Sequence, residues 1–260
     1  ALFKIASISK LYVAVAITKL VHNNQLSLDK TVADYFPELV GRIENAAKIT
    51  LRMMVQHRSG IPNFTDNPDF WKNQPYTYRD VLKYSLDIPS VFEPNKDYGY
   101  SNTNYLLLSR IIEHVTGGSR QDYFKTEILI PLGLNHTFGS IDDVNLDDVM
   151  SGDYVGIDKD FKNENNGMMI ATAEDVGIFL RALNDGSLLS EKEMEIYASI
   201  YEFNHGGLAP GYQCMAEYHK DIDAVVVQFR NTTDFEGYQW NLLEITHTRI
   251  VKILRRSKEK

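Results

Sequence analysis

The sequence predicts a protein of the α/β class, more narrowly α+β, with an antiparallel sheet flanked by helices and a mainly helical lobe. Three observations lead to this expectation. Apolar residues recur at helical spacing through most of the first 190 residues. Strand signals come late, where residues 213–219 and 224–230 flank a polar turn and suit an antiparallel hairpin. The pattern at residues 238–254 predicts a final helix.

The expected helices each combine an apolar stripe with a start or stop signal. The first follows Ser7, continues through the apolar positions of residues 11–21 and stops at residues 22–24. Thr50 is the expected N-cap of a short helix, and Thr172 opens another. Residues 140–166 are rich in Asp and Asn and are interpreted as a long surface excursion. The remaining helices are expected at residues 49–55, 77–86, 104–116 and 172–183.

A chain of 260 residues is long enough for one domain with a sizeable core, or for two closely packed lobes. We expect one catalytic unit over residues 1–260. Within it, the helical lobe is expected at about 11–190, and the hairpin and last helix at about 200–260. The apolar stretch at residues 11–21 is too short to span a membrane and contains Lys19, so we expect a buried helix there.

Charge and cysteine content exclude several classes of function. The formal net charge of -8 disfavours nonspecific nucleic-acid binding, which needs a basic surface. Cys214 is the single cysteine, which excludes an internal disulfide and a cysteine metal cluster. The seven histidines contain no H-E-x-x-H pattern, so no metal and no cofactor are expected. Four of them are interpreted as packing or surface residues: His57, His114, His136 and His247.

The segment Ser7-Ile8-Ser9-Lys10 has the spacing of an activated serine nucleophile. Residues i and i+3 share a helix face, so the Ser7 hydroxyl and the Lys10 amine can approach each other. A serine hydroxyl needs a base, and a lysine can be that base when burial or neighbouring cations lower its pKa. The pattern alone also fits a capping serine beside a solvated lysine.

Two further segments have chemistry that fits around such a serine. Tyr100-Ser101-Asn102 lies in an expected turn before the helix near residue 104, where a tyrosine can relay a proton and an asparagine can bind an amide. His205-Gly206-Gly207 precedes the hairpin, and its glycines let the backbone approach a ligand with free N–H groups. Taken singly, these segments also fit a helix-capping turn and a plain turn.

Together and in this order, the three motifs resemble the serine β-lactamase and penicillin-binding-protein superfamily, most closely its class C β-lactamases, DD-peptidases and related esterases. That family carries S-x-x-K, then Y-x-N, then K-T-G or H-x-G on a sheet strand. The resemblance implies a β-lactamase/transpeptidase-like fold and acyl transfer through a serine ester, with water as the usual final acceptor. Other family landmarks follow in family order at residues 3–7, 25–29, 49–62, 131–134, 172–175 and 205–212.

The resemblance also implies roles for individual residues. Ser7 would be the acylated nucleophile and Lys10 its proton acceptor, with Tyr100 sharing proton transfer and protonating the leaving group. Lys10 and Tyr100 are treated as a coupled pair. On the substrate side, Asn102 would hold an amide and His205 would border the pocket, while the backbone N–H groups of Ser7 and of Leu208, just after Gly207, would form the oxyanion hole.

Two departures from the family pattern lead us to expect that the full protein has residues beyond this sequence. Only six residues precede Ser7, where the family has two strands whose absence would leave the hairpin with an exposed edge. About fifteen residues separate Leu189 from His205, where the family fits more helix and strand. The family resemblance also implies a periplasmic or extracellular location.

The motifs are compatible with several classes of substrate. His205 stands where dedicated β-lactamases have a lysine, which favours a D-Ala-D-Ala carboxypeptidase, D-peptidase or esterase over a true β-lactamase. Expected partners are a small-molecule or peptide substrate, peptidoglycan-derived or a β-lactam. A catalytically inactive binding protein is the other alternative. An α/β-hydrolase is disfavoured because the chain lacks a G-x-S-x-G elbow.

Overall fold

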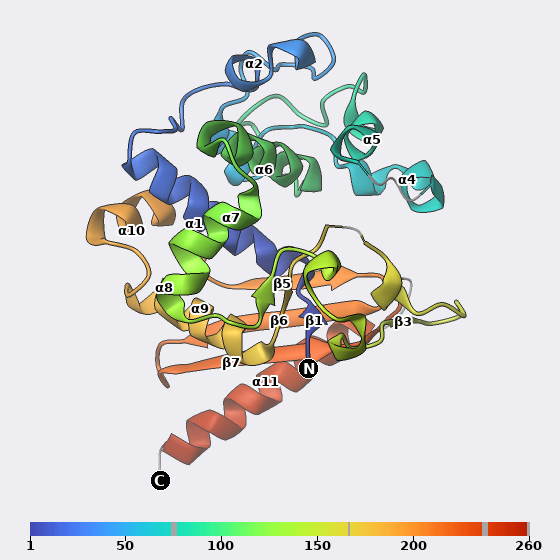
Figure 1. Ribbon diagram of the computed structural model, residues 1–260, viewed down its shortest axis with the longest axis vertical. Coiled ribbons are helices and arrows are strands. Elements are labelled where there is room, and N and C mark those ends of the chain that lie inside the picture. Colours follow the sequence, from blue (N-terminus) through green and yellow to red (C-terminus); the bar gives the residue numbers. More distant parts are fainter. Residues whose placement is uncertain (74–76, 166, 236–238, 259–260) are drawn as a thin grey trace. The chain divides into compact units, whose positions relative to one another are not determined.

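The structure is a computed structural model that describes residues 1–73, 77–165, 167–235 and 239–258. The chain forms two compact units (Figure 1). Unit 1 comprises Ala1–Tyr12, Phe124–Met194 and Glu202–Lys260, and unit 2 comprises Val13–Tyr123 and Glu195–Tyr201. The boundary therefore falls inside helix α1 (Ser9–His22), and residues 124–190 of the expected helical lobe belong to the unit that contains the sheet.

The main sheet of unit 1 is antiparallel, with the strand order β5-β6-β7. Strands β6 (Tyr212–His219) and β7 (Ala224–Arg230) form the predicted hairpin, with Ala216 opposite Val227. The His-Gly-Gly segment begins strand β5 (His205–Ala209), and His205 pairs with Ala216. The interpretation of this segment as a plain turn is therefore wrong, because its backbone continues the hydrogen-bonded ladder.

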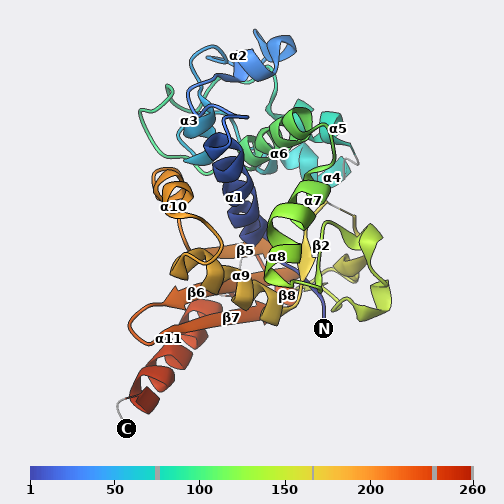
Figure 2. The ribbon, with the colours of Figure 1, turned by 60° about the vertical axis from the view of Figure 1, so that its left-hand side comes forward.

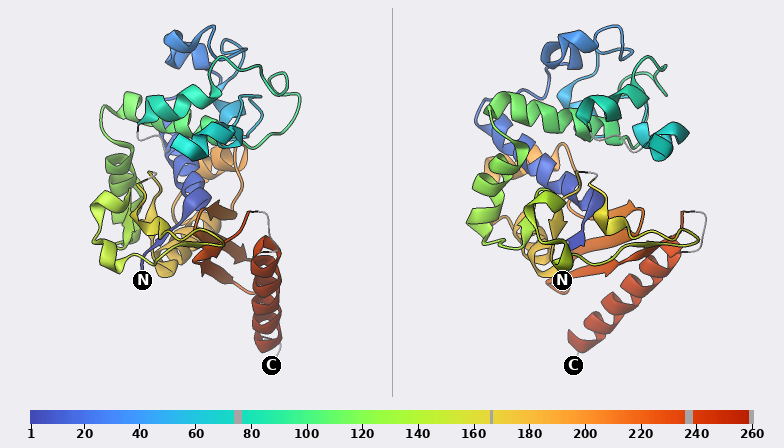
Figure 3. Two further views of the ribbon diagram at one scale, coloured as in Figure 1. Left: turned by 90° about the vertical axis from the view of Figure 1, so that its right-hand side faces the viewer. Right: turned by 45° about the vertical axis from the view of Figure 1, so that its right-hand side comes forward.

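Helices cover the two faces of this sheet, α9 on one side and α11 on the other (Figure 2). Helix α9 (Ala173–Asp185) has Thr172 as its N-cap, as predicted, and ends at Gly186 in the left-handed conformation. Helix α11 (Gln239–Lys258) crosses the opposite face and extends past the edge of the sheet (Figure 3). It confirms the predicted final helix, although Tyr238, its expected first residue, lies outside the described residues.

A second, small sheet fixes the backbone just before Ser7. Strand β1 (Phe3–Lys4) pairs with β4 (Ile170–Ala171), which also pairs with β2 (Thr137–Phe138). The Ile5 amide continues this attachment by donating to the Met169 carbonyl at 3.0 Å. The nucleophile segment thus starts from an ordered strand.

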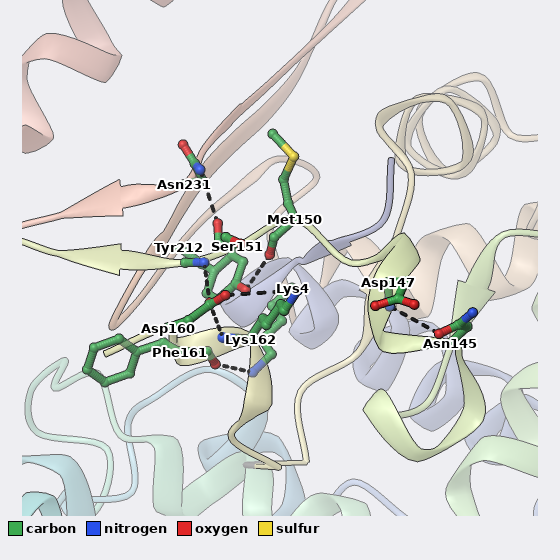
Figure 4. Close-up of polar contacts among 11 residues, drawn as sticks. Lys4, Asn145, Asp147, Met150, Ser151, Asp160, Phe161, Lys162, Tyr212 and Asn231 are labelled. Carbon is green, nitrogen blue, oxygen red and sulfur yellow. Dashed lines mark hydrogen bonds and ion pairs between the residues drawn. The ribbon is translucent and has the colours of Figure 1, made fainter. Parts of the chain in front are cut away.

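The predicted surface excursion is attached more firmly than its composition indicates (Figure 4). The buried amine of Lys4 donates to the carbonyls of Phe161 and Glu164, each at 2.7 Å. The Tyr212 hydroxyl donates to the Met150 carbonyl at 2.6 Å. Within the excursion, β3 (Asp153–Tyr154) pairs in parallel with β8 (Thr232–Thr233). These attachments link the excursion to β1 and β6, two strands that are distant from it in sequence. The local pattern of residues 140–166 therefore gives no sign of them.

Unit 2 is built from helices. Helix α6 (Asn102–Thr116) buries Leu107, Ile111 and Ile112 of the predicted stripe and has Gly117 as its C-cap. The predicted cap Thr50 accepts from the Met53 amide at 3.3 Å. Helix α6 begins two residues earlier than expected, because the Asn63 side chain accepts from the Asn102 amide at 3.0 Å. Besides α6 and residues 13–22 of α1, the α-helices with residues in this unit are α2 (Val32–Tyr35), α3 (Leu51–Val55), α4 (Pro68–Asn73), α5 (Tyr78–Leu82), α7 (Arg120–Phe124) and α10 (Glu191–Ala198).

The remaining α-helix of unit 1 is α8 (Ile130–Leu132), which follows a π-helical turn at Lys125–Leu129. Across the described ranges, no helix has the length and apolar character needed to cross a membrane.

Candidate active site

Ser7 lies in a short 3-10 turn, Ala6–Ile8, directly before helix α1. Its flanking residues Ala6 and Ile8 are buried, whereas Ser7 itself is partly exposed. Ala6 has a φ of 43°, a left-handed conformation that costs a non-glycine residue of the order of 1 kcal/mol. The fold therefore holds the residue before the serine in a strained conformation, a feature that is frequent at functional sites.

Lys10 lies where a base for Ser7 would be needed. Its Nζ lies 2.9 Å from the Ser7 Oγ, and its side chain is buried with 6% of its surface exposed. Burial lowers the pKa of the Lys10 amine from 10.5 to about 7, because a charged ammonium loses its hydration there. A substantial fraction of the amine is thus neutral near pH 7 and can accept the proton of the serine hydroxyl.

The two serines of the motif differ in their contacts. The Ser9 hydroxyl donates to the Ala6 carbonyl at 2.7 Å, a bond that stays within the turn. The Ser7 hydroxyl instead contacts the Lys10 amine. This difference makes Ser7 the candidate nucleophile.

Strand β5 packs against the Ser7 turn through Gly207. A Cβ at this position would lie 2.5 Å from the Cys214 Sγ and 2.8 Å from the Ile5 carbonyl oxygen, so a side chain cannot fit without displacement. Close approach of the two backbones thus requires glycine at 207. The next residue, Leu208, is exposed, and its N–H and that of Ser7 remain the candidate oxyanion donors.

His205 borders this region as a neutral side chain. Burial is the main cause that lowers its pKa from 6.5 to about 4, with the nearby Lys10 charge acting in the same direction. The Glu202 carboxylate lies 3.3 Å from the His205 Nε2, but its side chain is 61% exposed, so solvent screens its charge. His205 therefore supplies no fixed positive charge at neutral pH.

Unit 2 contains Tyr100 in the loop before α6 and Asn102 at the first position of that helix, and His57 shapes this loop. The buried His57 accepts at Nδ1 from the Ser101 amide at 3.0 Å, and its carbonyl accepts from the Gly99 amide at 2.9 Å. Its ring stacks on that of Tyr100, with ring centroids 4.4 Å apart. His57 thus fixes the backbone on both sides of Tyr100 as well as its ring.

The Asn102 side chain is held in the same unit. Its Nδ2 donates to the Asn63 Oδ1 at 3.2 Å and to the Thr65 Oγ1 at 3.3 Å. The amide is thereby oriented before any substrate binds, which reduces the ordering cost of using it as a binding group.

The predicted residues fall into two structural groups. Unit 1 contains Ser7, Lys10, His205, Gly207 and Leu208, while unit 2 contains Tyr100 and Asn102. Sequence reasoning missed the loop-shaping contacts of His57 and of Asn63 and Thr65. No local signal could have found them, because the His57 contact with Ser101 spans 44 positions and the Asn63 contact with Asn102 spans 39.

Comparison with known proteins gives these residues a family context. The model of the family described as Beta-lactamase matches residues 1–200, which is most of the chain. The chain belongs to the Beta-lactamase family. This is a family of β-lactamase-fold serine hydrolases, and the resemblance drawn from the three motifs is thereby confirmed.

Individual relatives agree with this assignment. Penicillin-binding protein 4* of Bacillus subtilis (strain 168) is 32% identical over 145 residues, which cover 52% of this chain and 30% of the relative. The matched part therefore spans less than a third of that protein.

Solved structures share the fold of this Beta-lactamase family member. The D-amino acid amidase from Ochrobactrum anthropi SV3 superposes with a TM-score of 0.82 at 22% identity, covering 99% of this chain and 85% of the amidase. A penicillin-binding protein from Bacillus halodurans gives a TM-score of 0.75 at 23% identity, covering 89% of this chain and 82% of that protein. These likenesses confirm the predicted fold class.

Proposed function

We propose that this protein hydrolyses amide or ester bonds through an acyl-enzyme formed on Ser7. The observation that supports this most strongly is the 2.9 Å contact between the Ser7 Oγ and the Lys10 Nζ, in a setting that lowers the pKa of the amine to about 7. A serine paired with a neutral amine has both parts needed for nucleophilic attack.

In the proposed reaction, Lys10 accepts the proton of Ser7 as the Oγ attacks the substrate carbonyl carbon. The N–H groups of Ser7 and Leu208 stabilise the oxyanion. When the intermediate collapses, the bond from carbon to the leaving group breaks, and a proton passes to the leaving group through Tyr100. Water then attacks the Ser7 ester, the acid product departs, and the serine recovers its proton. In this scheme Tyr100 serves the leaving group and Asn102 holds the substrate amide.

The proposed substrate is a small amide, ester or peptide of a D-amino acid, D-Ala-D-Ala peptides included. A neutral His205 cannot attract a substrate carboxylate electrostatically, which favours uncharged amides and esters over substrates that carry a carboxylate, such as β-lactams and, among the proposed substrates, D-Ala-D-Ala peptides. Two of the matching folds come from proteins described as a D-amino acid amidase and a D-stereospecific amidohydrolase. Their names support the choice of D-amino acid derivatives over the L series.

Covalent labelling tests the acyl-enzyme. The protein is treated with a fluorophosphonate and, separately, with a fluorescent penicillin, and the intact mass and labelled peptide are measured. We expect one adduct, on the peptide that contains Ser7, and complete loss of labelling in Ser7→Ala. Ser9→Ala is the matched control because the Ser9 hydroxyl contacts only backbone among the interactions described for it. Absence of any adduct in the native protein would favour an inactive binding protein.

Turnover of matched substrates tests the proposed specificity. The panel pairs the D and L forms of phenylalanine amide with a D-Ala-D-Ala peptide, a p-nitrophenyl ester and nitrocefin. We expect the D-amide, D-peptide or ester to give the highest kcat/KM. Nitrocefin turnover faster by orders of magnitude would show a true β-lactamase, even if Ser7 labelling succeeds.

A further inference from the structure

Strand β6 and helix α11 bring together three side chains that suit a metal ion. They are Glu217 and His219, two positions apart on β6, and His247 on α11. In the described part of the chain, the metal-binding atoms of these three side chains all lie within 4.8 Å of one another. Sequence reasoning considered the histidines one at a time, and the fold places two of them together.

The spacing of the three ligand atoms matches a tetrahedral site. The Nε2 atoms of His219 and His247 are 3.4 Å apart, and the Glu217 Oε2 lies 3.2 Å from His247 Nε2 and 3.7 Å from His219 Nε2. Zinc bonds of 2.0–2.1 Å in a tetrahedron require ligand atoms about 3.4 Å apart. One ion can therefore contact all three atoms with little movement.

Burial indicates why these groups face one another. The His247 side chain is 5% exposed and occupies the centre of the α11 face that packs on the sheet, between the buried residues Leu243 and Val251. Among the described residues, its Nδ1 has no hydrogen-bond partner, so the polar contacts of this buried ring lie on its Nε2 side. The His219 and Glu217 side chains are 14% and 39% exposed, which leaves a path for an ion from solvent.

The donor set selects the ion. Two imidazole nitrogens and one carboxylate oxygen suit zinc and related divalent transition metals better than calcium or magnesium, which prefer oxygen ligands. The nearby Arg255 guanidinium is engaged by Asp221 at 2.6 Å, so its positive charge is offset close to its source. We propose that Glu217, His219 and His247 bind one Zn²⁺, with water as the fourth ligand.

The position of the proposed metal site indicates a structural role and not a catalytic one. Glu217 and His219 alternate along β6 with the fully buried Ala216 and Cys214, and Cys214 faces the Ser7 turn through its contact with the Ile5 carbonyl. The metal ligands therefore lie on the opposite face of the sheet, which α11 covers. An ion there would join α11 to β6 and would leave the Ser7 chemistry unchanged.

Metal binding to the full chain tests the proposal directly. After treatment with EDTA and its removal, Zn²⁺ binding is measured by calorimetry, and Co²⁺ is added as a probe whose visible absorption reports tetrahedral coordination. We expect one Zn²⁺ per chain with a Kd of about 1 μM or below, and a Tm a few degrees higher with zinc. Tetrahedral Co²⁺ bands should appear at the same stoichiometry.

Variants identify the ligands. His219→Ala and Glu217→Gln alter partly exposed positions and should weaken Zn²⁺ binding at least about 100-fold, whereas His136→Ala, at a side chain that is 68% exposed, should leave it unchanged. His247→Gln tests the buried ligand if the variant folds. Saturable binding that survives both His219→Ala and Glu217→Gln, or no binding by the native protein, would overturn the proposal.

Discussion

Two buried lysines near the start of the chain, Lys4 and Lys10, show how differently one fold uses the same side chain. Their exposed fractions are 1% and 6%, and burial lowers the pKa of Lys4 to about 8 and that of Lys10 to about 7. Lys4 donates to two backbone carbonyls, whereas Lys10 contacts the Ser7 hydroxyl. A lowered pKa alone therefore does not distinguish a catalytic lysine from a structural one.

The partners of each amine explain the difference. Around Lys4, the negative charges of Glu164 and Asp160 counter part of the effect of burial on its pKa and favour the charged ammonium. For Lys10, burial lowers the pKa, and the neutral amine lies against a hydroxyl that can give up a proton. The first arrangement holds a loop, and the second fits the base that we propose for Ser7.

Replacement of Lys10 should give the largest effect. Lys10→Ala removes the proton acceptor of Ser7, so we expect the rate constant for acylation by a fluorophosphonate to fall about 10³-fold, equivalent to about 4 kcal/mol. Lys10→Arg keeps the charge but cannot deprotonate near pH 7, and should lose a similar factor. A loss smaller than about tenfold in both variants, with the fold intact by circular dichroism, would show that Lys10 is not the base.

Replacement of Lys4 should change stability and leave the chemistry nearly intact. Lys4→Met keeps much of the side-chain volume but leaves the carbonyls of Phe161 and Glu164 without this donor. We expect the free energy of unfolding in urea to fall by about 2 kcal/mol. The acylation rate of the folded protein should stay within about threefold. A selective collapse of that rate, with stability retained, would remove the contrast between the two lysines.

Substitution at Gly207 tests how closely β5 must approach the Ser7 turn. Gly207→Ala places a Cβ 2.5 Å from the Cys214 Sγ, and we expect about 1–3 kcal/mol of destabilisation and a slower acylation rate. The matched control is Gly177→Ala in α9, where a Cβ would lie 3.8 Å from the nearest Val227 methyl carbon. That variant should be neutral or more stable, since alanine favours a helix. Equal behaviour of the two variants in thermal unfolding and labelling would contradict this account.

Local pattern predicted much of the fold. The stripes that define α1, α6 and α9, the Thr50 and Thr172 caps and the hairpin of β6 and β7 depend on residues close in sequence. The contact between Ser7 and Lys10 could also be predicted from the sequence. The two residues are three positions apart, so the geometry of one helical turn brings their side chains together. Propensity and spacing are sufficient where partners are near neighbours.

Other features depend on partners that are distant in sequence. Lys4 contacts Phe161 across 157 positions, and His219 contacts His247 across 28. Nothing in the residues around Lys4 distinguishes it from a solvated lysine, and residues 140–166 lack the periodicity that would indicate an anchored segment. Such contacts are set by tertiary packing, which local composition does not encode.

The pH dependence of Ser7 acylation tests the central claim that a neutral Lys10 activates Ser7. The second-order rate constant for an uncharged fluorophosphonate is measured from pH 5 to 9. Because the neutral amine is the active form and its pKa is about 7, the rate should rise with pH, be half-maximal near pH 7 and fall about tenfold per pH unit well below it. Lys10→Ala should lose this inflection. A rate that is independent of pH from 5 to 8, or an inflection unchanged in Lys10→Ala, would contradict the account.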